Sequence, residues 1–382
     1  MKVMHVITRL ILGGAQQTAL RLCEELVDRG HTVTLVYGPI FGPEGTLLGR
    51  AEASGATLVE LPTLHREVAP LTDWRCARGL RRLIHETKPD VVHTHSSKAG
   101  ILGRYAAWKE GVALVTHTVH GLPWHDRQSA WKNRMFQALE HEAAKHCHRL
   151  IAVTRQMRDE FVRLGIAPLE KFEVIPSGID IERFHAAPGT RERTRAELGI
   201  PPDAPVLGIV ARLDPLKGHD DLLDVFPRLQ QRLPELRMLW VGDGWDRERL
   251  DRRIAEAGLG DRVIRSGVVD EEAVPPLLRA MDVKALPSYQ EGQSRTLPEA
   301  LLCGCGVVAY DAGGIGSIVK DGETGRLVPR GDKAALAEAI AWMIEHDDER
   351  KRLVDAGREQ VCNRFSSRAM LDAHADLYRG ST

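Results

Sequence analysis

Two glutamates in the segment EGQSRTLPEA have the spacing and surroundings of ligand-binding carboxylates. Glu291 lies on a predicted loop, and Glu299 follows after seven residues, about one turn inside a predicted helix. Ser294 has a residue type preferred at a helix N-cap, and Pro298 is tolerated only near a helix start. Carboxylates accept hydrogen bonds from sugar hydroxyls, and the N–H groups of a helix start attract phosphate. A solvated loop glutamate and a first-turn glutamate favoured by the helix dipole are the simpler explanation of the pair alone.

Two cations stand at the end of a predicted strand in the segment VLGIVARLDPLKG. Arg212 closes the strand, and Lys217 follows five residues later beside Gly218. A guanidinium offers a planar fork to phosphate oxygens and a lysine a mobile point charge, so together they suit a nucleoside diphosphate. Isolated loop cations are usually solvated, and the phosphate interpretation depends on the second anion site expected near residue 294.

A glycine pair marks the first predicted strand-to-helix turn, in ITRLILGGAQQTALRLCEELVDRGHTV. Gly13 and Gly14 allow the backbone to approach a ligand closely. The pattern GxGxxG is absent, so a dinucleotide fingerprint is not supported. A purely structural turn explains the pair equally well.

Histidines cluster at two predicted strand ends, HTHSSK (93–98) and VTHTVHGLPWH (115–125). His117, His120 and His125 have no carboxylate or third ligand at a fixed spacing, and HExxH is absent, so no metal site is predicted. A satisfied structural histidine is the ordinary explanation of each. Together they favour a polar pocket in which neutral imidazoles hold sugar hydroxyls.

The elements that must position these residues follow a strand-helix rhythm along all 382 residues. Near-continuous apolar strands alternate with stretches of helical period, which indicates an α/β fold with parallel sheets. The segment VIPSGIDIERF interrupts this rhythm, so we expect an N-terminal Rossmann-like domain over 1–178 and a C-terminal one over 179–363. A final helix within 364–382 is a candidate to cross back to the first domain. Two such domains facing across a central cleft would bring the carboxyl ends of their strands to the ligand.

Composition is that of a soluble globular protein, with 43% hydrophobic and 27% charged residues. The N-terminal apolar run is too short and too broken by glycine to span a bilayer or act as a secretory signal, so a cytoplasmic location is expected. Six cysteines without a regular framework predict free thiols, and core packing is favoured over metal binding for Cys303 and Cys305.

Basic residues are concentrated in the first half. Residues 1–178 contain 23 lysines and arginines against 18 acidic residues, and 12 of the 16 histidines. Arg75, Arg78 and Arg82 fall on one side of a predicted helix, beside Arg81, and could contact anionic lipid headgroups, although a solvated face is the simpler explanation. Peripheral contact with the inner membrane surface is therefore an open alternative, and no nucleic-acid partner is expected.

Taken together, these segments resemble the family-4 retaining glycosyltransferases of the GT-B fold, which use nucleotide diphosphate sugars. The resemblance covers essentially the whole chain, with the pieces in the expected order: GGAQ, VHG, VIPSGID, ARLDPLKG, VGDG, the glutamate pair, DAGGIGSIV and DGETGRLVP. Each piece is weak alone, whereas the ordered set is highly specific.

The resemblance implies roles for individual residues. Glu291 would bind hydroxyls of the donor sugar and Glu299 those of the ribose, Arg212 and Lys217 would clamp the diphosphate, and His120 would line the sugar and acceptor side. The four implied catalytic residues are His120, Arg212, Lys217 and Glu291. The implied donor-binding set is Gly13, Gly14, Arg212, Lys217, Val268, Glu291, Gly292, Gln293, Ser294, Arg295, Thr296 and Glu299.

The implied reaction moves a hexose or N-acetylhexosamine to a hydroxyl of a glycan or lipid-linked glycan in cell-surface polysaccharide biosynthesis. UDP is preferred to GDP as the donor base. The anomeric configuration would be kept by a front-face displacement in which the departing phosphate helps to deprotonate the acceptor. Neither a metal nor a permanently bound cofactor is expected.

Departures from the family pattern leave the donor sugar open. Gly292, Gln293 and Ser294, followed by Arg295 and Thr296, stand where Gly-Phe-Gly is common after the first glutamate. Gly316 and Ser317 replace a frequent Pro-Glu. A nucleotide-sugar epimerase or sugar-phosphate synthase on the same twin-domain plan is the nearest alternative. A non-catalytic two-lobed binding protein is the alternative of another class, and a glycosidase would not need the phosphate-type cations.

Overall fold

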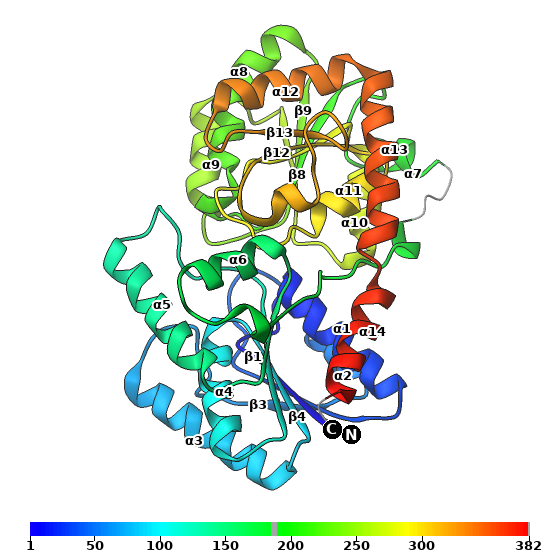
Figure 1. Cartoon of the computed structure of the whole chain (residues 1–382). Coiled ribbons are helices and arrows are strands. Elements are labelled where there is room, and N and C mark those ends of the chain that lie inside the picture. The colour runs from blue at the N-terminus through cyan, green and yellow to red at the C-terminus, as the bar shows by residue number, and fades with distance from the viewer. Residues whose placement is uncertain (185–188, 381–382) are drawn as a thin grey trace. The chain divides into compact units, whose positions relative to one another are not determined.

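Two parallel sheets form the framework of the chain (Figure 1). The computed structural model describes residues 1–184 and 189–380. By their contacts the residues divide into two compact units, the first made of Met1–Phe41, Gly45–Gly178 and Arg368–Thr382, the second of Gly42–Glu44 and Ile179–Ser367. Each unit has one sheet of its own, so the prediction of two Rossmann-like α/β domains is confirmed.

The sheet of the first unit has seven strands in the order β3-β2-β1-β4-β5-β6-β7. Their bounds are β1 (Lys2–Ile7), β2 (Thr32–Tyr37), β3 (Thr57–Glu60), β4 (Val91–His95), β5 (Leu114–Val119), β6 (Arg149–Ala152) and β7 (Phe172–Val174). All neighbours pair in parallel. The order reverses between β1 and β4, which is the position where open α/β sheets bind ligands beyond their carboxyl ends.

Helices cover both faces of this sheet because alternate side chains of each strand point to opposite faces. The helices are α1 (Gly14–Asp28), α2 (Leu48–Ala53), α3 (Pro70–Thr87), α4 (Ser97–Lys109), α5 (Ala130–Ala144), α6 (Arg155–Arg163) and α14 (Ser367–Arg379). Val3 and Ile7 of β1 pack with Leu20 of α1 and Tyr378 of α14. Met4 and Val6 pack in the opposite core, to which α3 and α4 contribute.

The sheet of the second unit has six parallel strands in the order β10-β9-β8-β11-β12-β13. They are β8 (Val206–Val210), β9 (Arg237–Val241), β10 (Val263–Gly267), β11 (Val283–Leu286), β12 (Gly306–Tyr310) and β13 (Arg326–Val328). Its helices are α7 (Thr190–Glu197), α8 (His219–Arg232), α9 (Arg247–Glu256), α10 (Val274–Ala280), α11 (Thr296–Leu302), α12 (Lys333–Glu345) and α13 (Asp347–Arg364). Short 3-10 helices are η1 (Leu169–Lys171), η2 (Glu182–Phe184), η3 (Pro215–Lys217), η4 (Glu271–Ala273) and η5 (Gly313–Ser317).

The long apolar runs of the sequence are strands, as predicted. The segments TVTLVY, VALVTHTVH and CGVVAYD contain β2, β5 and β12, and MHVIT overlaps β1, which begins two residues earlier and ends one residue earlier. The three- and four-residue strands β3, β7 and β13 were not foreseen, because their apolar runs are too short to stand out from the surrounding loops. The last helix, α14, buries Met370 and Leu371 against residues of the first unit.

Two general features of the chain concern its environment. All six cysteines have free thiols; Cys305 is fully buried in a core cluster and Cys303 packs against the same cluster. Within residues 1–184 and 189–380, no helix has both the length and the apolar character that crossing a membrane requires.

Candidate active site

A lysine and a glutamate meet beyond the carboxyl ends of β8 and β11. These two strands are parallel neighbours, so the loops that follow them leave the sheet at the same edge. Lys217 Nζ donates to Glu291 Oε1 at 2.6 Å, with the two side chains 20% and 11% exposed. The structure therefore brings together two predicted site residues that lie far apart in the sequence.

Glycines allow the loops around this ion pair to dock backbone against backbone. Gly218 has φ +78°, and a Cβ there would lie 2.1 Å from the carbonyl oxygen of Pro287. Gly313 has φ +54°, and a Cβ there would lie 2.0 Å from the carbonyl oxygen of Glu291. A side chain at either position would displace the loop that carries Glu291, because both the space and the left-handed conformation require glycine. Close backbone packing therefore explains the glycines Gly218 and Gly313 in the motifs LKG and DAGG.

Arg212, the second predicted clamp residue, lies after β8 at the same edge. Its Nη1 donates to Glu44 Oε1 at 2.7 Å, and the guanidinium side chain is 40% exposed. Gly242 of the VGDG motif packs on Ala211, the residue before Arg212, since a Cβ at Gly242 would lie 2.2 Å from the carbonyl oxygen of Ala211. Both predicted clamp cations are therefore neutralised by carboxylates of their own unit, Lys217 by Glu291 and Arg212 by Glu44.

Glu299 lies in the first turn of α11 and is buried, with 7% of its surface exposed. Burial raises the pKa of its carboxyl group, and Arg295, 3.8 Å away through Nε, opposes that rise. The regular helix begins at Thr296, and Arg295 directly before it already has helical backbone angles. The Ser294 hydroxyl accepts from Leu297 N at 3.4 Å, which is the hydrogen bond expected of the predicted cap residue.

The other residues expected to bind the donor lie on loops of the second unit. Val268 directly follows β10, as predicted, and is 40% exposed. In the loop before α11, Ser294 is buried, whereas Gly292, Gln293 and Arg295 are partly exposed. Thr296, the first residue of α11, is also partly exposed. Pro298 lies inside the first turn of α11, where a proline lacking its N–H is tolerated.

Lys284 is a feature of this region that the sequence analysis missed. It lies in β11 and is completely buried, and its Nζ has no hydrogen-bond partner within the described part of the chain. Burial lowers its pKa to about 8, against the attraction of Glu291 and Glu299. A lysine inside the apolar run DVKALPS was the available signal, because an uncompensated buried charge is costly.

The candidate residues of the first unit lie where β1 and β5 end. His120 directly follows β5 and is partly buried, with its Nε2 3.1 Å from His95 Nδ1. Gly13 is the N-cap of α1 in an extended conformation that any residue adopts. A Cβ at Gly13 would contact only the mobile end of the Gln16 side chain. Neither the backbone nor the packing therefore demands glycine at position 13.

Three fully buried histidines lie side by side on β1 and β4. His5 pairs with His93 across the two strands, and His95 is two residues further along β4, so all three share one face of the sheet. Each offers a ring nitrogen within 4.8 Å of the others. The sequence analysis did not foresee this cluster, because His5 is distant in sequence and only the strand register brings it to His93 and His95.

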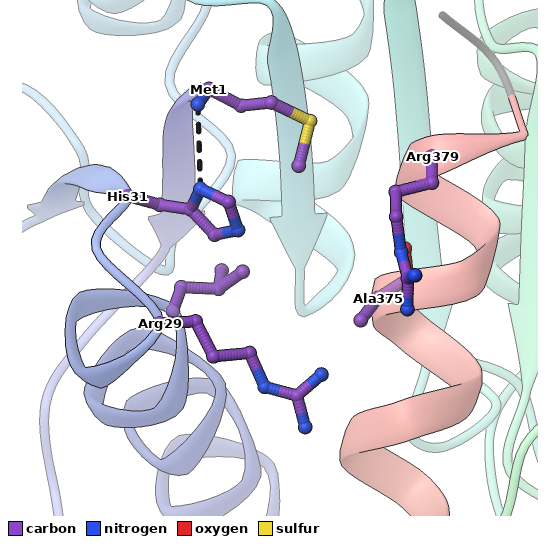
Figure 2. Close-up of a pocket in the computed structure, with 6 residues that line it drawn as sticks. Met1, Arg29, His31, Ala375 and Arg379 are labelled. Carbon is purple, nitrogen blue, oxygen red and sulfur yellow. Dashed lines mark hydrogen bonds between the residues drawn. The ribbon is translucent and has the colours of Figure 1, made fainter.

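A pocket of about 270 Å³ lies at the opposite end of the first sheet (Figure 2). It is lined by Met1, Leu26, Arg29, His31, Ala375 and Arg379. The Met1 amino group lies 3.3 Å from His31 Nδ1, while Arg29 is paired with Glu25 and Asp372. Ligands of open α/β sheets bind at the carboxyl ends of the strands, so this pocket at the amino end is not the candidate active site.

Comparison with known proteins identifies the family. Two family models match the chain, "Glycosyltransferase Family 4" over residues 12–183 and "Glycosyl transferases group 1" over residues 190–360. The chain is 29% identical over 382 residues to the UDP-Gal:alpha-D-GlcNAc-diphosphoundecaprenol alpha-1,3-galactosyltransferase of Escherichia coli, covering 99% of this chain and 96% of the relative. It is 33% identical over 315 residues to a D-inositol 3-phosphate glycosyltransferase of Catenulispora acidiphila, covering 76% and 71%.

A solved structure shares the fold. Anabaena HepE in complex with UDP-glucose superimposes with a TM-score of 0.86 over the whole of both chains at 24% identity. The order of motifs, the two Rossmann-like sheets and these relatives agree. The chain therefore belongs to the family-4 type of glycosyltransferases with the GT-B fold, and it is a glycosyltransferase.

Proposed function

We propose that the protein transfers a hexose or N-acetylhexosamine from a UDP-sugar to a hydroxyl of a glycan or lipid-linked glycan in cell-surface polysaccharide biosynthesis. The observation that carries the proposal is the Lys217–Glu291 pair at the edge shared by β8 and β11. The name of the Escherichia coli relative supports the donor base and the lipid-linked acceptor, since it describes transfer from UDP-Gal to a diphosphoundecaprenol-linked sugar.

Donor binding would exchange the partners of the two cations. Lys217 Nζ would move from Glu291 to a phosphate oxygen, and Arg212 would likewise exchange Glu44 for the diphosphate. Glu291 would then accept hydrogen bonds from hydroxyls of the donor sugar. Positive charge at the diphosphate stabilises the negative charge that grows as it leaves, in a site that is already organised before reaction.

Sugar transfer breaks the bond between the anomeric carbon and the diphosphate oxygen, and forms one between that carbon and the acceptor oxygen. In our proposal the acceptor proton passes to the departing phosphate on the same face, so the anomeric configuration is retained. The chain's own contribution is to orient both substrates and stabilise charge. This step requires neither a metal nor a permanently bound cofactor.

Other residues of the second unit would hold the nucleoside. Glu299 would bind the ribose hydroxyls, and the backbone at Val268 would lie against the base. Val268 supports this role by being 40% exposed directly after β10. Glu299 supports it by being held at a fixed place in the first turn of α11. The loop residues Gly292, Gln293, Ser294, Arg295 and Thr296 would select the donor sugar.

The first unit would bind the acceptor. His120 would face the sugar and acceptor, and the turn at Gly13 and Gly14 would leave room for substrate. The absence of any backbone or packing demand for glycine at Gly13 supports this role. We place the protein in the cytoplasm, where UDP-sugars are made.

One helix face of the first unit supports peripheral binding to an anionic membrane surface. Leu71 and Trp74 of α3 are 78% and 60% exposed, and the Arg78 guanidinium carbon lies 5.6 Å from the Trp74 ring centroid. Aromatic and basic side chains together suit the headgroup region of a bilayer. Arg81 and Arg82 are paired with acidic residues, so we assign the contact to Trp74, Arg75 and Arg78.

Liposome flotation tests the membrane contact. We expect the protein to float with vesicles containing phosphatidylglycerol, to float less at high salt, and to remain unbound with phosphatidylcholine alone. The double change Trp74→Ala with Arg78→Ala should abolish flotation, and Arg82→Ala is the matched control. Absence of flotation in the wild type would remove the membrane partner.

Thermal stabilisation by UDP, GDP, ADP and their sugar conjugates tests the donor site. A ligand present at about 100 times its Kd stabilises the folded state by about 2.7 kcal/mol, which raises the Tm. We expect a shift with UDP compounds that Arg212→Ala and Lys217→Ala remove. Lys351→Ala is the control, because Lys351 is an exposed lysine of the same unit paired with Asp347. A shift with GDP alone would correct the base, and no shift with any nucleotide would contradict the proposal.

Product analysis separates the transferase from its nearest alternative. A nucleotide-sugar epimerase would change the sugar without an acceptor, and a sugar-phosphate synthase would need a sugar phosphate as acceptor. We expect UDP release that depends on an added glycan or lipid-linked acceptor.

A further inference from the structure

A chain of three imidazoles runs through the first unit from the middle of β1 to the residue after β5. His5 Nδ1 lies 3.0 Å from His95 Nε2, and His95 Nδ1 lies 3.1 Å from His120 Nε2. The register explains the alignment, because Ile7 of β1 pairs with His95, and His95 pairs with Thr118 of β5. His5 and His120 each lie two residues from those partners, on the same face.

The inner two rings of this chain are neutral. His5 and His95 are fully buried, and the titratable groups around them are other histidines: His93, His374 and, on the opposite face, His117. Burial lowers the pKa of His5 to about 3 and holds that of His95 well below its ordinary value. A neutral imidazole has one N–H donor and one bare acceptor nitrogen.

The position of the proton on each ring follows from the unpaired end of the chain. His5 Nε2 is buried and has no hydrogen-bond partner within residues 1–184 and 189–380. An orphaned N–H is rarer in proteins than an acceptor lacking a donor, so the proton of His5 belongs on Nδ1, where it is donated to His95 Nε2. His95 then carries its own proton on Nδ1 and donates it to His120 Nε2. His120 must in turn carry its proton on Nδ1.

We propose that His5 and His95 are positioning residues that hold His120 as the Nδ1–H tautomer, with Nδ1 as the donor to an oxygen of the bound substrate. The use of that donor depends on the proposed function, whereas the tautomer order is a property of the chain alone. The Nδ1–H of His120 would select a hydroxyl or phosphate oxygen as its acceptor. His120 would not take a proton from the substrate, since its Nε2 already accepts from His95.

A second set of bonds keeps the middle of the chain in place. His93 Nε2 lies 2.7 Å from Thr118 Oγ1, and His93 Nδ1 lies 2.5 Å from the hydroxyl of Tyr378 on α14. The His93 ring centroid is 4.2 Å from that of His95. His93 therefore fixes the plane of the His95 ring without joining the donor chain, and α14 anchors it.

Imidazole nitrogen NMR tests the tautomer order directly, because protonated and bare ring nitrogens have well-separated ¹⁵N shifts. In the wild-type protein at neutral pH we expect His5, His95 and His120 all to be protonated at Nδ1. A finding of Nε2–H on His120 overturns the proposal. One equivalent of tightly bound zinc in the purified protein, measured by elemental analysis, also overturns it, because ring nitrogens of His5 and His95 would then be ligands.

Variants at the buried end of the chain test the coupling. His5→Phe removes the first donor, and we expect His120 to lose its exclusive Nδ1–H state, with kcat/KM falling about tenfold, the size of one hydrogen bond. His5→Asn places an amide N–H near the position of Nδ1 and should restore both readouts. His148→Phe is the matched control, since His148 is a histidine of the same unit whose Nδ1 accepts from Val115 N and which takes no part in the imidazole chain.

The outcomes separate this proposal from the proposed function. An unchanged His120 tautomer in His5→Phe, or an equal loss of kcat/KM in His148→Phe, overturns the positioning role. The expected tautomers without UDP-sugar turnover would contradict the proposed function and leave the tautomer order standing. UDP-sugar turnover with Nε2–H on His120 would support the proposed function and overturn the tautomer order.

Discussion

The two sheets of this protein differ in the polar groups that they bury. Beside the first sheet, His5, His93 and His95 are fully buried neutral rings bonded through their nitrogens. Beyond the carboxyl ends of the second sheet's strands, Lys217 and Glu291 form a charged pair, while Lys284 is buried within β11. The first unit also buries an ion pair, Arg104–Glu140, but on its helices and not on its strands. Neutral rings can be linked in series because each is both donor and acceptor, whereas a buried charge requires an opposite charge close by.

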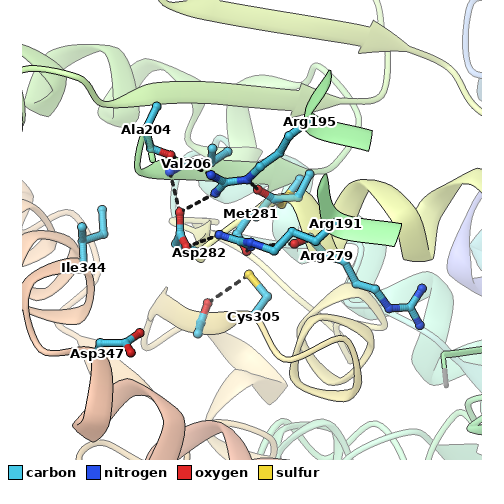
Figure 3. A network of polar contacts seen from close by, with 12 residues as sticks. Arg191, Arg195, Ala204, Val206, Arg279, Met281, Asp282, Cys305, Ile344 and Asp347 are labelled. Atoms are coloured by element: carbon cyan, nitrogen blue, oxygen red, sulfur yellow. Dashed lines mark hydrogen bonds and ion pairs between the residues drawn. The ribbon is translucent and has the colours of Figure 1, made fainter. Parts of the chain in front are cut away.

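A second contrast lies between the amino ends and the carboxyl ends of the strands of the second sheet. At the amino edge, just before β11, the Asp282 carboxylate accepts from Arg191 at 2.5 Å, Arg195 at 2.9 Å and Val206 N at 2.8 Å (Figure 3). At the carboxyl ends of the strands, the bond from Lys217 Nζ to Glu291 Oε1 joins one donor to one acceptor. Oppositely charged side chains thus form a cross-linked network at the amino ends of the strands and a single, readily exchanged pair at their carboxyl ends.

Acidification should give the largest difference between the sheets. The unfolded chain binds protons at histidine below about pH 6.5, while the folded first unit resists them, since the pKa of His5 is about 3. The stabilisation is therefore fully present above pH 6.5 and is lost as pH falls from 6.5 towards 3, by about 2 kcal/mol at pH 5 for each such histidine. Hydrogen exchange of β1 and β11 amides between pH 7 and 5 measures it.

The second sheet should keep its protection over that range. The lowered pKa values of Asp220 and Asp224 give stability that is present above their ordinary value and lost only as pH falls below it. His219 is a buried histidine of the second unit whose pKa is lowered to about 4. It adds the same kind of loss of stability on acidification, but at one position. An equal loss of hydrogen-exchange protection in β1 and β11 between pH 7 and 5 would contradict the expected difference between the two sheets.

Removing the support at the amino edge should unfold much of the second unit. Asp282→Ala leaves Arg195, whose side chain is 5% exposed, without its carboxylate, and loss of one partner of a buried pair costs about 3–5 kcal/mol. Urea denaturation measures this change. Asp282→Asn should cost less because it keeps an acceptor oxygen. A loss below about 1 kcal/mol, the level of an exposed pair, would mean that the network does not support the sheet.

Breaking the pair at the carboxyl edge should affect catalysis far more than folding. Lys217→Ala should lower the transfer rate by about 10²–10³-fold, the effect of removing one charge-stabilising donor. The free energy of unfolding should change by about 1 kcal/mol, as for a partly exposed pair. Initial rates of UDP release and urea denaturation give the two values. A stability loss as large as that of Asp282→Ala, with activity retained, would make the pair structural.

The smallest of these effects concerns the nucleoside. Glu299→Gln keeps the side chain's shape inside α11 but weakens its bonds to ribose hydroxyls, so UDP affinity should fall about tenfold with the fold intact. Calorimetric titration with UDP measures the affinity, and Glu323→Gln, an exposed glutamate of the same unit, is the control. Unchanged affinity would remove the ribose role.

Much of the fold was accessible from local patterns in the sequence. Apolar runs of five or six residues predicted the central strands, and turn glycines with strand-end charges located the second unit's candidate residues. These signals are local because strand and helix periodicity arises within a few residues. The ordered motifs, including ARLDPLKG, VGDG and the glutamate pair, identified the family for the same reason.

Only the tertiary structure decided which residues meet. Pairing of β8 with β11 brings Lys217 to Glu291, and the register of β1 and β4 brings His5 to His95; neither partner is marked by local sequence. The cap of α11 was a local matter by contrast, since the Ser294 hydroxyl accepts from Leu297 N three residues on. Sequence alone therefore determined the elements, the family and the chemical types at the strand ends. Their pairing depended on long-range packing, because strand order and register are set by burial across the whole sheet.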